Sequence, residues 1–340
     1  MGTIQKAAGD GRFGEMKNVA EKNKLYVAMY HYIRDLAHSR YPDIKGLDLS
    51  LFREQIGFLK RTFRIVTMEE VILAARGTYE LPEQALLLTF DDGYIDHFTF
   101  AMPILEENHV QGAFFIPGKT FEEHSLLDVN KIHYILAGAK PERLLADLLA
   151  RMDYYRGNEF DFPDNKELWE QYGARDGRFD TPEVLFVKRM LQIVLPEPLR
   201  KRISSELFES YVGVPEKILA YELYMTREQI RTMKRHGMHI GIHGYDHYWL
   251  GNLSKEMMEA DIAQELAVMD EFIDRDAWVM NYPYGSYNDQ VIAYIRSRGC
   301  CLGFTTEVRI ARLNKDEPFK LPRLDCNDFP PKSGNYKTIE

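Results

Sequence analysis

The sequence predicts an α/β protein built from parallel β/α units, and three observations carry that prediction. Seven short runs of apolar, β-branched or aromatic residues are separated mostly by segments with helical patterns. The length of 340 residues suits a single α/β barrel, a fold that routinely reaches this size. Charged and histidine residues directly follow several of the apolar runs, which is where parallel barrels carry their chemistry.

Each predicted strand is a run of four to eight residues. The runs are 25–32, 63–66, 85–90, 113–116, 238–243, 277–280 and 302–305. Helices are expected between most of them. Thr67-x-x-Glu70 and Thr226-x-x-Gln229 each have the spacing of a capping box, and apolar residues over 52–63 repeat at helical spacing.

Residues 120–222 do not fit a simple β/α unit. Their pattern predicts helices at 129–137, 142–154, 181–194 and 198–211. We interpret 120–222 as a helical insertion within the barrel that caps the active site.

Residues 1–15 are expected to be a disordered or vector-derived lead, and 16–340 to contain the barrel, because Met16 could itself be a start. The N-terminal segment lacks the apolar core of a signal peptide. No later run of about 20 apolar residues could span a bilayer. We therefore expect a cytoplasmic protein without a membrane span.

The composition narrows the range of partners. Lys and Arg number 43 against 52 Asp and Glu, a net charge of −9, so a nucleic-acid partner is not expected. The three cysteines, Cys300, Cys301 and Cys326, contain no CxxC pair, which argues against a disulfide framework and a cysteine zinc site. The sequence gives no indication of the oligomeric state.

Three short segments together indicate a metal hydrolase. Asp91 and Asp92 follow the third apolar run, and two neighbouring carboxylates can divide the work, one binding a cation and one taking a proton from water. His243 and His247 are four residues apart, a spacing that lets both reach one cation. Two histidines and one carboxylate leave a Zn²⁺-type ion an open position for water or substrate. The third segment is Asn281-Tyr282-Pro283-Tyr284-Gly285.

This ordered set resembles the polysaccharide deacetylase family, the NodB-homology or family 4 carbohydrate esterases, over about Leu25 to Asp328. The resemblance implies a distorted (β/α) barrel of about seven parallel strands. It also implies hydrolysis of N-acyl groups from amino sugars, a reaction at linear amide C–N bonds. Asp91 would be the general base, and Asp92, His243 and His247 the metal ligands. Zn²⁺ is the metal expected first, although these ligands also suit Co²⁺, Ni²⁺ or Fe²⁺.

The third motif of the family lines the groove for acetate. Pro283, Tyr284 and Gly285 match it, and the backbone N–H of Tyr284 would help to hold the oxyanion. Asn281 begins the same motif and is expected to contribute to substrate binding. Trp249 is expected to form a wall for the methyl group of the acyl chain.

The chain departs from the family at three places, one of which is Gly244, which follows the first histidine where the family usually has serine or threonine. Asn281 stands where the family usually has an arginine that steadies the base, and no histidine follows His247, so the late histidine that acts as general acid has no counterpart. We expect Arg323 to replace the missing arginine beside Asp91. His31 is the first candidate for the acid and Asp325 the second.

The resulting expectation is a metal-dependent amidohydrolase that removes an acetyl or formyl group from an amino sugar. A cytoplasmic enzyme would act on a nucleotide-linked or lipid-linked precursor in surface polysaccharide biosynthesis. Two alternatives stay open: a deacetylase-like glycan-binding module with impaired catalysis, and a hydrolase of a non-sugar amide.

Overall fold

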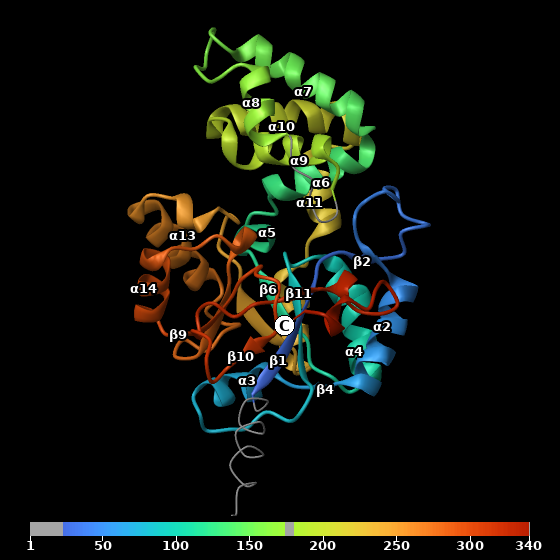
Figure 1. The fold of residues 1–340 in the computed structure, drawn as a ribbon, viewed down its shortest axis with the longest axis vertical. Coiled ribbons are helices and arrows are strands. Elements are labelled where there is room, and N and C mark those ends of the chain that lie inside the picture. The colour runs from blue at the N-terminus through green and yellow to red at the C-terminus, as the bar shows by residue number, and fades with distance from the viewer. Residues whose placement is uncertain (1–22, 174–179, 340) are drawn as a thin grey trace, which may run out of the picture. The chain divides into compact units, whose positions relative to one another are not determined.

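The structure is a computed structural model that describes residues 23–173 and 180–339, so the predicted lead at 1–15 lies outside the described residues. The chain forms two compact units (Figure 1). The barrel unit comprises residues up to 31 together with 50–118 and 227–340. The helical unit comprises 32–49 and 119–226.

The barrel unit is built on one curled sheet whose main path has the order β10-β1-β5-β6-β7-β8-β9. These strands are β1 (Lys24–Tyr30), β5 (Ala85–Asp91), β6 (Ala113–Ile116), β7 (His239–Ile242), β8 (Trp278–Asn281), β9 (Cys300–Phe304) and β10 (Ala311–Arg312). Two short strands, β4 (Arg64–Ile65) and β11 (Leu324–Asp325), pair with β5 and β1. All neighbours are parallel except β10, which runs antiparallel to β1. The predicted fold class, a distorted barrel of about seven parallel strands, is confirmed, with the antiparallel β10 as the exception; β10 and β11 had no counterpart in the sequence prediction.

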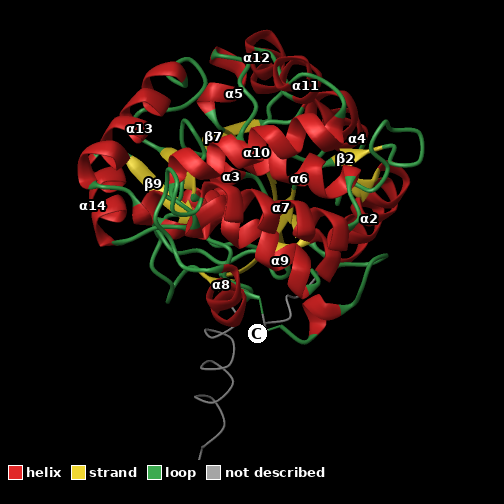
Figure 2. Cartoon of the chain, turned by 90° about the horizontal axis from the view of Figure 1, so that it is seen from above, coloured by secondary structure: helices red, strands yellow, loops and turns green. Residues whose placement is uncertain are grey.

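Helices surround this sheet, as expected for parallel β/α units. They are α2 (Leu49–Thr62), α3 (Met68–Ala75), α4 (Met102–Glu107), α12 (Arg227–Arg235), α13 (Lys255–Val268) and α14 (Asp289–Ser297), whereas α5 (Gly118–Glu122) begins at the boundary with the helical unit. A π-helix, η1 (His97–Ala101), precedes α4, and short 3₁₀ turns occur at η3 (Leu250–Asn252), η4 (Pro283–Gly285), η5 (Cys326–Asp328) and η6 (Asn335–Lys337). Helices α2 and α4 lie on one side of the strands and α13 and α14 on the other (Figure 1). The view from above shows the same helices outside the strands (Figure 2).

The core of the barrel unit is centred on β5, which is buried at all seven positions. It lies between β1 and β6, and a strand covered on both faces reads as a continuous apolar run. Aromatic rings continue the core on one side, where Phe90 stacks on Phe114 with centroids 4.6 Å apart. This packing fixes the strand end that carries Asp91.

The helical unit consists mainly of short helices. They are α6 (Asp128–Gly138), α7 (Pro141–Tyr155), α8 (Asn165–Tyr172), α9 (Pro182–Arg189), the π-helix η2 (Met190–Val194), α10 (Glu197–Val212) and α11 (Glu216–Leu223). Two short parallel strands, β2 (Ile33–Arg34) and β3 (Leu47–Asp48), belong to the same unit. The helix predicted over 181–194 changes from α to π geometry at Met190, and α8 and α11 had no counterpart in the sequence prediction.

Aromatic residues of the helical unit pack within it. Trp169 lies against Phe186 with centroids 5.0 Å apart, and Tyr155 donates a hydrogen bond to Glu206 at 2.5 Å. Leu168 and Phe186 are buried beside them. These contacts give this aromatic cluster a structural role within the unit.

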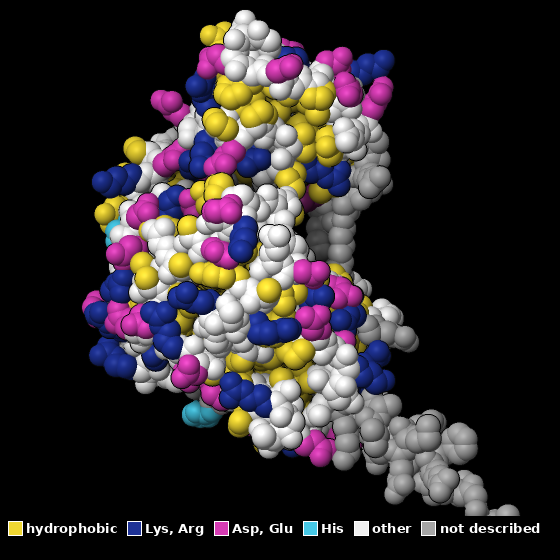
Figure 3. All heavy atoms as spheres, turned by 90° about the vertical axis from the view of Figure 1, so that its left-hand side faces the viewer, with side chains coloured by type: hydrophobic (Ala, Val, Ile, Leu, Met, Phe, Trp, Pro, Cys, Tyr) yellow, Lys and Arg dark blue, Asp and Glu magenta, His cyan; other side chains and the backbone are white. Residues whose placement is uncertain are grey.

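The surface carries both signs of charge in close mixture. On the face that Figure 3 displays, basic and acidic side chains are interspersed. Exposed pairs such as Arg231 with Glu271, 2.5 Å apart, contribute little to stability individually. Among the described residues, no helix has the length and apolar character needed to cross a membrane.

The capping box predicted at Thr67 is confirmed and can be tested. The Thr67 hydroxyl accepts the Glu70 N–H, and the Glu70 carboxylate accepts the Thr67 N–H at 2.8 Å. Thr67→Ala should lower the free energy of unfolding by about 1 kcal/mol in urea denaturation, because α3 loses its N-cap acceptor. Thr62→Ala, at an exposed position in the last turn of α2, should change it by no more than about 0.5 kcal/mol. Equal losses in the two variants would contradict the capping role.

Candidate metal and active site

The sheet brings the three motifs to one edge of the barrel unit. Strand β5 ends at Asp91, β7 ends one residue before His243, and β8 ends at Asn281. These strands are parallel and lie in the order β5-β6-β7-β8. Their carboxyl ends therefore meet, which is where barrels of this kind carry their functional groups.

Asp92, His243 and His247 converge on one point. The Nε2 atoms of both imidazoles lie 3.3 Å from Asp92 Oδ1. All three residues are buried, with exposed fractions of 2%, 2% and 7%. Within 23–173 and 180–339 this is the one group of three or more His, Cys, Asp or Glu side chains whose ligand atoms all lie within 4.8 Å of one another.

Hydrogen bonds orient two of these candidate ligands. His243 Nδ1 lies 2.7 Å from the carbonyl oxygen of Asn281 and must donate to it, so the lone pair of Nε2 faces Asp92. Tyr94 donates its hydroxyl to Asp92 Oδ2 at 2.5 Å, which leaves Oδ1 toward the imidazoles. Burial lowers the pKa of His247, so this ring is neutral at pH 7 and can serve as a ligand.

The donor set fits a divalent cation. Asp92 Oδ1 is buried and accepts no hydrogen bond from the described residues, although it lies between two ring nitrogens. A buried carboxylate oxygen without a donor is costly and calls for an ion or a proton in its place. Two imidazoles and one carboxylate match the ligands of catalytic zinc sites.

Three non-glycine residues of the site have a left-handed backbone. The φ angle is 75° at Asp92, 53° at His247 and 58° at Tyr284. This conformation is uncommon outside glycine, and it concentrates at functional sites where the surrounding structure imposes it. The fold therefore holds these residues in positions that their local sequence does not favour.

Asp91 lies beside Arg323. Arg323 Nη1 donates to Asp91 Oδ1 at 2.9 Å, while its Nε donates to the carbonyl of Thr305 at 3.0 Å. Burial raises the pKa of Asp91, but the charge of the Arg323 guanidinium and its hydrogen bond help to outweigh it, so the pKa is lowered. Asp91 is thus ionised at neutral pH and can accept a proton.

His31 also approaches Asp91. Its Nε2 lies 3.7 Å from Asp91 Oδ2, and its side chain is 37% exposed, so it can meet solvent or a substrate. Its carbonyl accepts a hydrogen bond from buried His97 at 2.9 Å, and burial lowers the pKa of His97 to about 4. A neutral His97 therefore fixes the backbone of His31 by donating a hydrogen bond to its carbonyl.

Asp325 is the N-cap residue of η5. Its carboxylate accepts hydrogen bonds from the backbone N–H and the side-chain amide of Asn327, at 2.8 and 2.7 Å, and it caps η5. No described contact joins it to Asp91. Of the two candidates for the general acid, the structure brings only His31 to the site.

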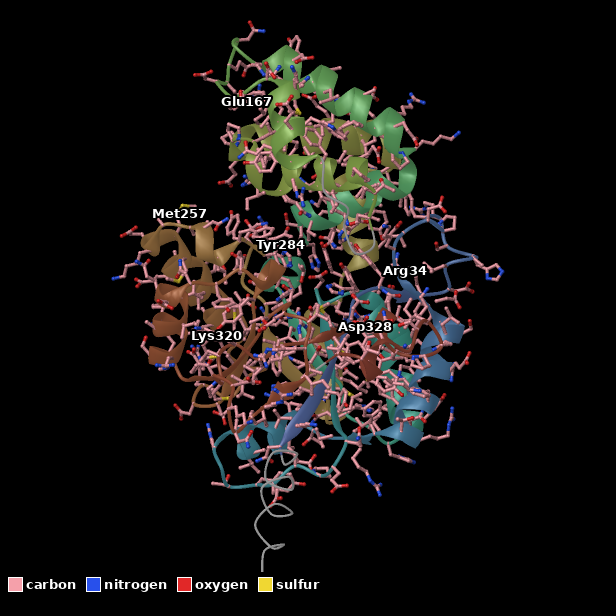
Figure 4. The ribbon with its side chains drawn as sticks, viewed as in Figure 1. Arg34, Glu167, Met257, Tyr284, Lys320 and Asp328 are labelled. Atoms are coloured by element: carbon pink, nitrogen blue, oxygen red, sulfur yellow. The ribbon has the colours of Figure 1, made fainter. Side chains whose placement is uncertain are left out.

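The Pro283–Gly285 segment lies next to His247, one of the predicted metal ligands. The ring of Tyr284 meets the ring of His247 edge to face at 4.7 Å, and Trp249 stacks on Tyr284 at 4.5 Å. Figure 4 labels Tyr284 beyond the strand ends. Gly285 has φ 68°, and a Cβ there would collide with Thr306, so this turn requires glycine.

Asn281 contacts the site through its backbone carbonyl, which accepts a hydrogen bond from His243. Its side chain is fully buried, and neither amide atom has a hydrogen-bond partner among the described residues. Its backbone carbonyl orients His243. The part of Asn281 in substrate binding stays a prediction.

Sequence reasoning missed Tyr94, Asp261 and Glu265. Tyr94 follows the aspartate motif directly, and that adjacency is a usable signal. Asp261 and Glu265 lie one turn apart on the buried face of α13, beside Met258, Ile262 and Leu266. Two acidic residues on the apolar face of a helix indicate that their carboxylates accept hydrogen bonds from buried groups.

Comparison with known proteins agrees with this geometry. The profile of the polysaccharide deacetylase family matches residues 78–160 and 207–301, more than half of the chain. The protein therefore belongs to the polysaccharide deacetylase family, and the resemblance seen in the sequence is confirmed.

Two curated relatives match shorter segments. YxkH of Bacillus subtilis, assigned to the polysaccharide deacetylases, is 28% identical over 91 residues, 27% of this chain and 33% of YxkH. The poly-β-1,6-N-acetyl-D-glucosamine N-deacetylase of Escherichia coli K12 is 34% identical over 86 residues, 25% of this chain and 12% of that enzyme. The similarity thus spans well under two thirds of either relative.

Solved structures share the fold over nearly the whole chain. The Streptococcus pyogenes deacetylase PplD, in complex with acetate, superposes with a TM-score of 0.56 at 17% identity, covering 93% of this chain and 98% of PplD. IcaB from Ammonifex degensii gives 0.53 at 19% identity, covering 93% and 95%. At these identities the likeness establishes the fold.

The metal site leads to a direct prediction. Asp92→Asn should abolish stoichiometric Zn²⁺ binding, because the variant replaces the carboxylate oxygen between the two imidazoles with a neutral amide. Metal content after dialysis, measured by mass spectrometry, checks this. His236→Gln, which alters a histidine paired with Glu106, should retain the wild-type metal content. Full metal binding by Asp92→Asn would show that the cluster is not the metal site.

Proposed function

We propose that this protein is a metal-dependent hydrolase that removes an N-acyl group, acetyl or formyl, from an amino sugar. The observation that carries the proposal is the position of Asp92 Oδ1, 3.3 Å from both imidazole nitrogens, with ionised Asp91 next to it in the chain. A bound divalent cation would lower the pKa of a water and polarise the amide carbonyl.

Asp91 acts as the general base in this proposal. Its ion pair with Arg323 keeps it ionised and fixes Oδ1, while Oδ2 faces His31. A carboxylate held in this way can take the proton of an attacking water. Arg323 acts through Asp91, as a positioning residue.

The tetrahedral oxyanion requires donors that are in place before the reaction. The backbone N–H of Tyr284 is the proposed donor, because φ 58° and the packing against His247 and Trp249 fix this peptide. Pro283 and Gly285 complete the turn, and the Trp249–Tyr284 stack offers an apolar surface for the acyl methyl group.

The amine leaving group needs a proton. His31, 3.7 Å from Asp91 and partly exposed, is the proposed donor. If His31→Gln retains wild-type turnover, Asp91 itself would have to return the proton that it took. This variant separates the two routes.

The proposed substrate is a nucleotide-linked or lipid-linked amino sugar, a precursor of a surface glycan, met in the cytoplasm. The name of the Escherichia coli relative points to a polymer of N-acetylglucosamine as the alternative substrate. Release of acetate or formate should be measured with a nucleotide-linked N-acylglucosamine and with β-1,6- and β-1,4-linked oligomers. The insertion at 120–222 is proposed to cap the site, so a variant lacking these residues would lose selectivity among these substrates.

Asp91→Asn tests the base. Because Asn cannot accept the proton, kcat should fall by roughly 10²- to 10⁴-fold, while Zn²⁺ content stays at the wild-type level. Acyl release and metal analysis on the same sample check both parts. Near-normal turnover would refute the role of Asp91. Metal binding without turnover on any substrate in the wild type would instead favour a glycan-binding module.

Arg323→Met tests the ion pair through pH. Arg323 lowers the pKa of Asp91, so without it the pKa should rise, and the base would be ionised only at higher pH. The acid limb of the kcat/KM profile should therefore move to higher pH. Arg309→Met removes a guanidinium that pairs with Asp316 instead, and it should leave the limb in place. An unmoved limb in Arg323→Met would contradict the assignment.

A further inference from the structure

The 243–247 loop, which contains both histidine ligands, is hydrogen-bonded to the side chain of Asp261 in α13. Asp261 Oδ2 accepts the backbone N–H of Tyr245 at 3.0 Å, and Oδ1 accepts the N–H of Asp246 at 3.0 Å. Asp261 is 7% exposed, so water competes little for these bonds. Both oxygens of one buried carboxylate are thus aimed at consecutive amides of the segment that carries His243 and His247.

The loop cannot adopt its shape from local preferences alone. Gly244 has φ 72° and His247 has φ 53°, so its two ends are left-handed. A Cβ on Gly244 would lie 3.3 Å from Asp261 Oδ2 and 3.4 Å from Pro283. The Asp261 carboxylate and Pro283 therefore pack closely against Gly244, the residue that follows His243.

A second acid on α13 supports the same region. Glu265 lies one turn after Asp261, is fully buried and accepts the N–H of Gly118 at 2.7 Å. A Cβ on Gly118 would collide with Glu265 Oε2 and would lie 3.0 Å from Tyr245 Cδ2. One face of α13 thus contacts both the 243–247 loop and the backbone at Gly118.

We propose that Asp261 is a positioning residue of the metal centre, whose carboxylate fixes the 243–247 loop so that both imidazoles face Asp92 before the metal binds. The inference deepens the proposed function and rests on its metal site. Preorganised ligands bind more tightly, because less ordering remains to be done on binding. Without Asp261, two buried amides lose their acceptors and the second histidine loses its support.

The test is a Zn²⁺ titration of the full-length protein against a competing chromogenic chelator. Asp261→Ala removes both acceptors and should weaken Zn²⁺ binding by about 10- to 100-fold. Asp261→Asn keeps one acceptor oxygen and should fall between this variant and wild type. The visible spectrum of the Co²⁺-loaded protein should change in the same order, because ligand geometry changes.

Ser254→Ala is the matched control. Ser254 caps the same helix by accepting the Met257 N–H, and no described hydrogen bond joins its side chain to the loop. This variant should lower the Tm of the metal-free protein but leave Zn²⁺ affinity and the Co²⁺ spectrum unchanged. If Asp261→Ala does not fold, the comparison of Asp261→Asn with Ser254→Ala still decides.

Wild-type affinity in both Asp261 variants would overturn the inference and leave the proposed function intact. Absence of Zn²⁺ binding in the wild type would overturn both. Weakened binding in the variants combined with no deacylation by the wild type would support Asp261 as a positioning residue and reject the proposed reaction.

Discussion

The site depends on one electrostatic constraint, the close approach of three lone-pair atoms in the interior of the protein. Asp92 Oδ1 and the Nε2 atoms of His243 and His247 are buried and face one another at 3.3 Å. Such an arrangement is unfavourable unless a cation or protons occupy it. The parallel sheet, the Tyr94 and Asn281 contacts and the left-handed loop residues all serve to maintain it.

Two adjacent aspartates acquire different properties from their surroundings. Asp91 pairs with Arg323 and lies near a partly exposed histidine, whereas Asp92 receives the Tyr94 hydroxyl and faces two imidazoles. Because neighbouring strand residues point in opposite directions and β5 ends here, the left-handed φ of 75° at Asp92 is what brings both carboxylates to the same site. Environment, and not residue type, thus separates the proposed base from the proposed ligand.

The guanidinium beside Asp91 comes from Arg323, near the C-terminal end of the chain, and not from the end of β8. β8 ends in Asn281, and the guanidinium comes instead from Arg323, immediately before β11. The pairing of Leu324 with Ala28 in β1 aligns this segment with β5, since β1 also pairs with β5. Solved deacetylases at 17% and 19% identity share the fold over more than nine tenths of this chain, so this framework tolerates large changes in sequence.

The sequence by itself determined the barrel class, the positions of seven strands and the three motifs, because apolar runs and the residues that end them are local signals. The two-residue strands β2, β3, β10 and β11 are too short to give such a signal. It also indicated Arg323 and His31. The family motif lacks its arginine and its late histidine here, so another residue has to pair with the base and another has to protonate the amine. Only the tertiary structure decided that His31 approaches Asp91 while Asp325 caps η5. The same is true of Asp261 and Glu265, whose partners are backbone amides 15 or more residues away. Such contacts arise when α13 packs on the sheet, and no pattern along the chain records which amide a buried carboxylate will meet.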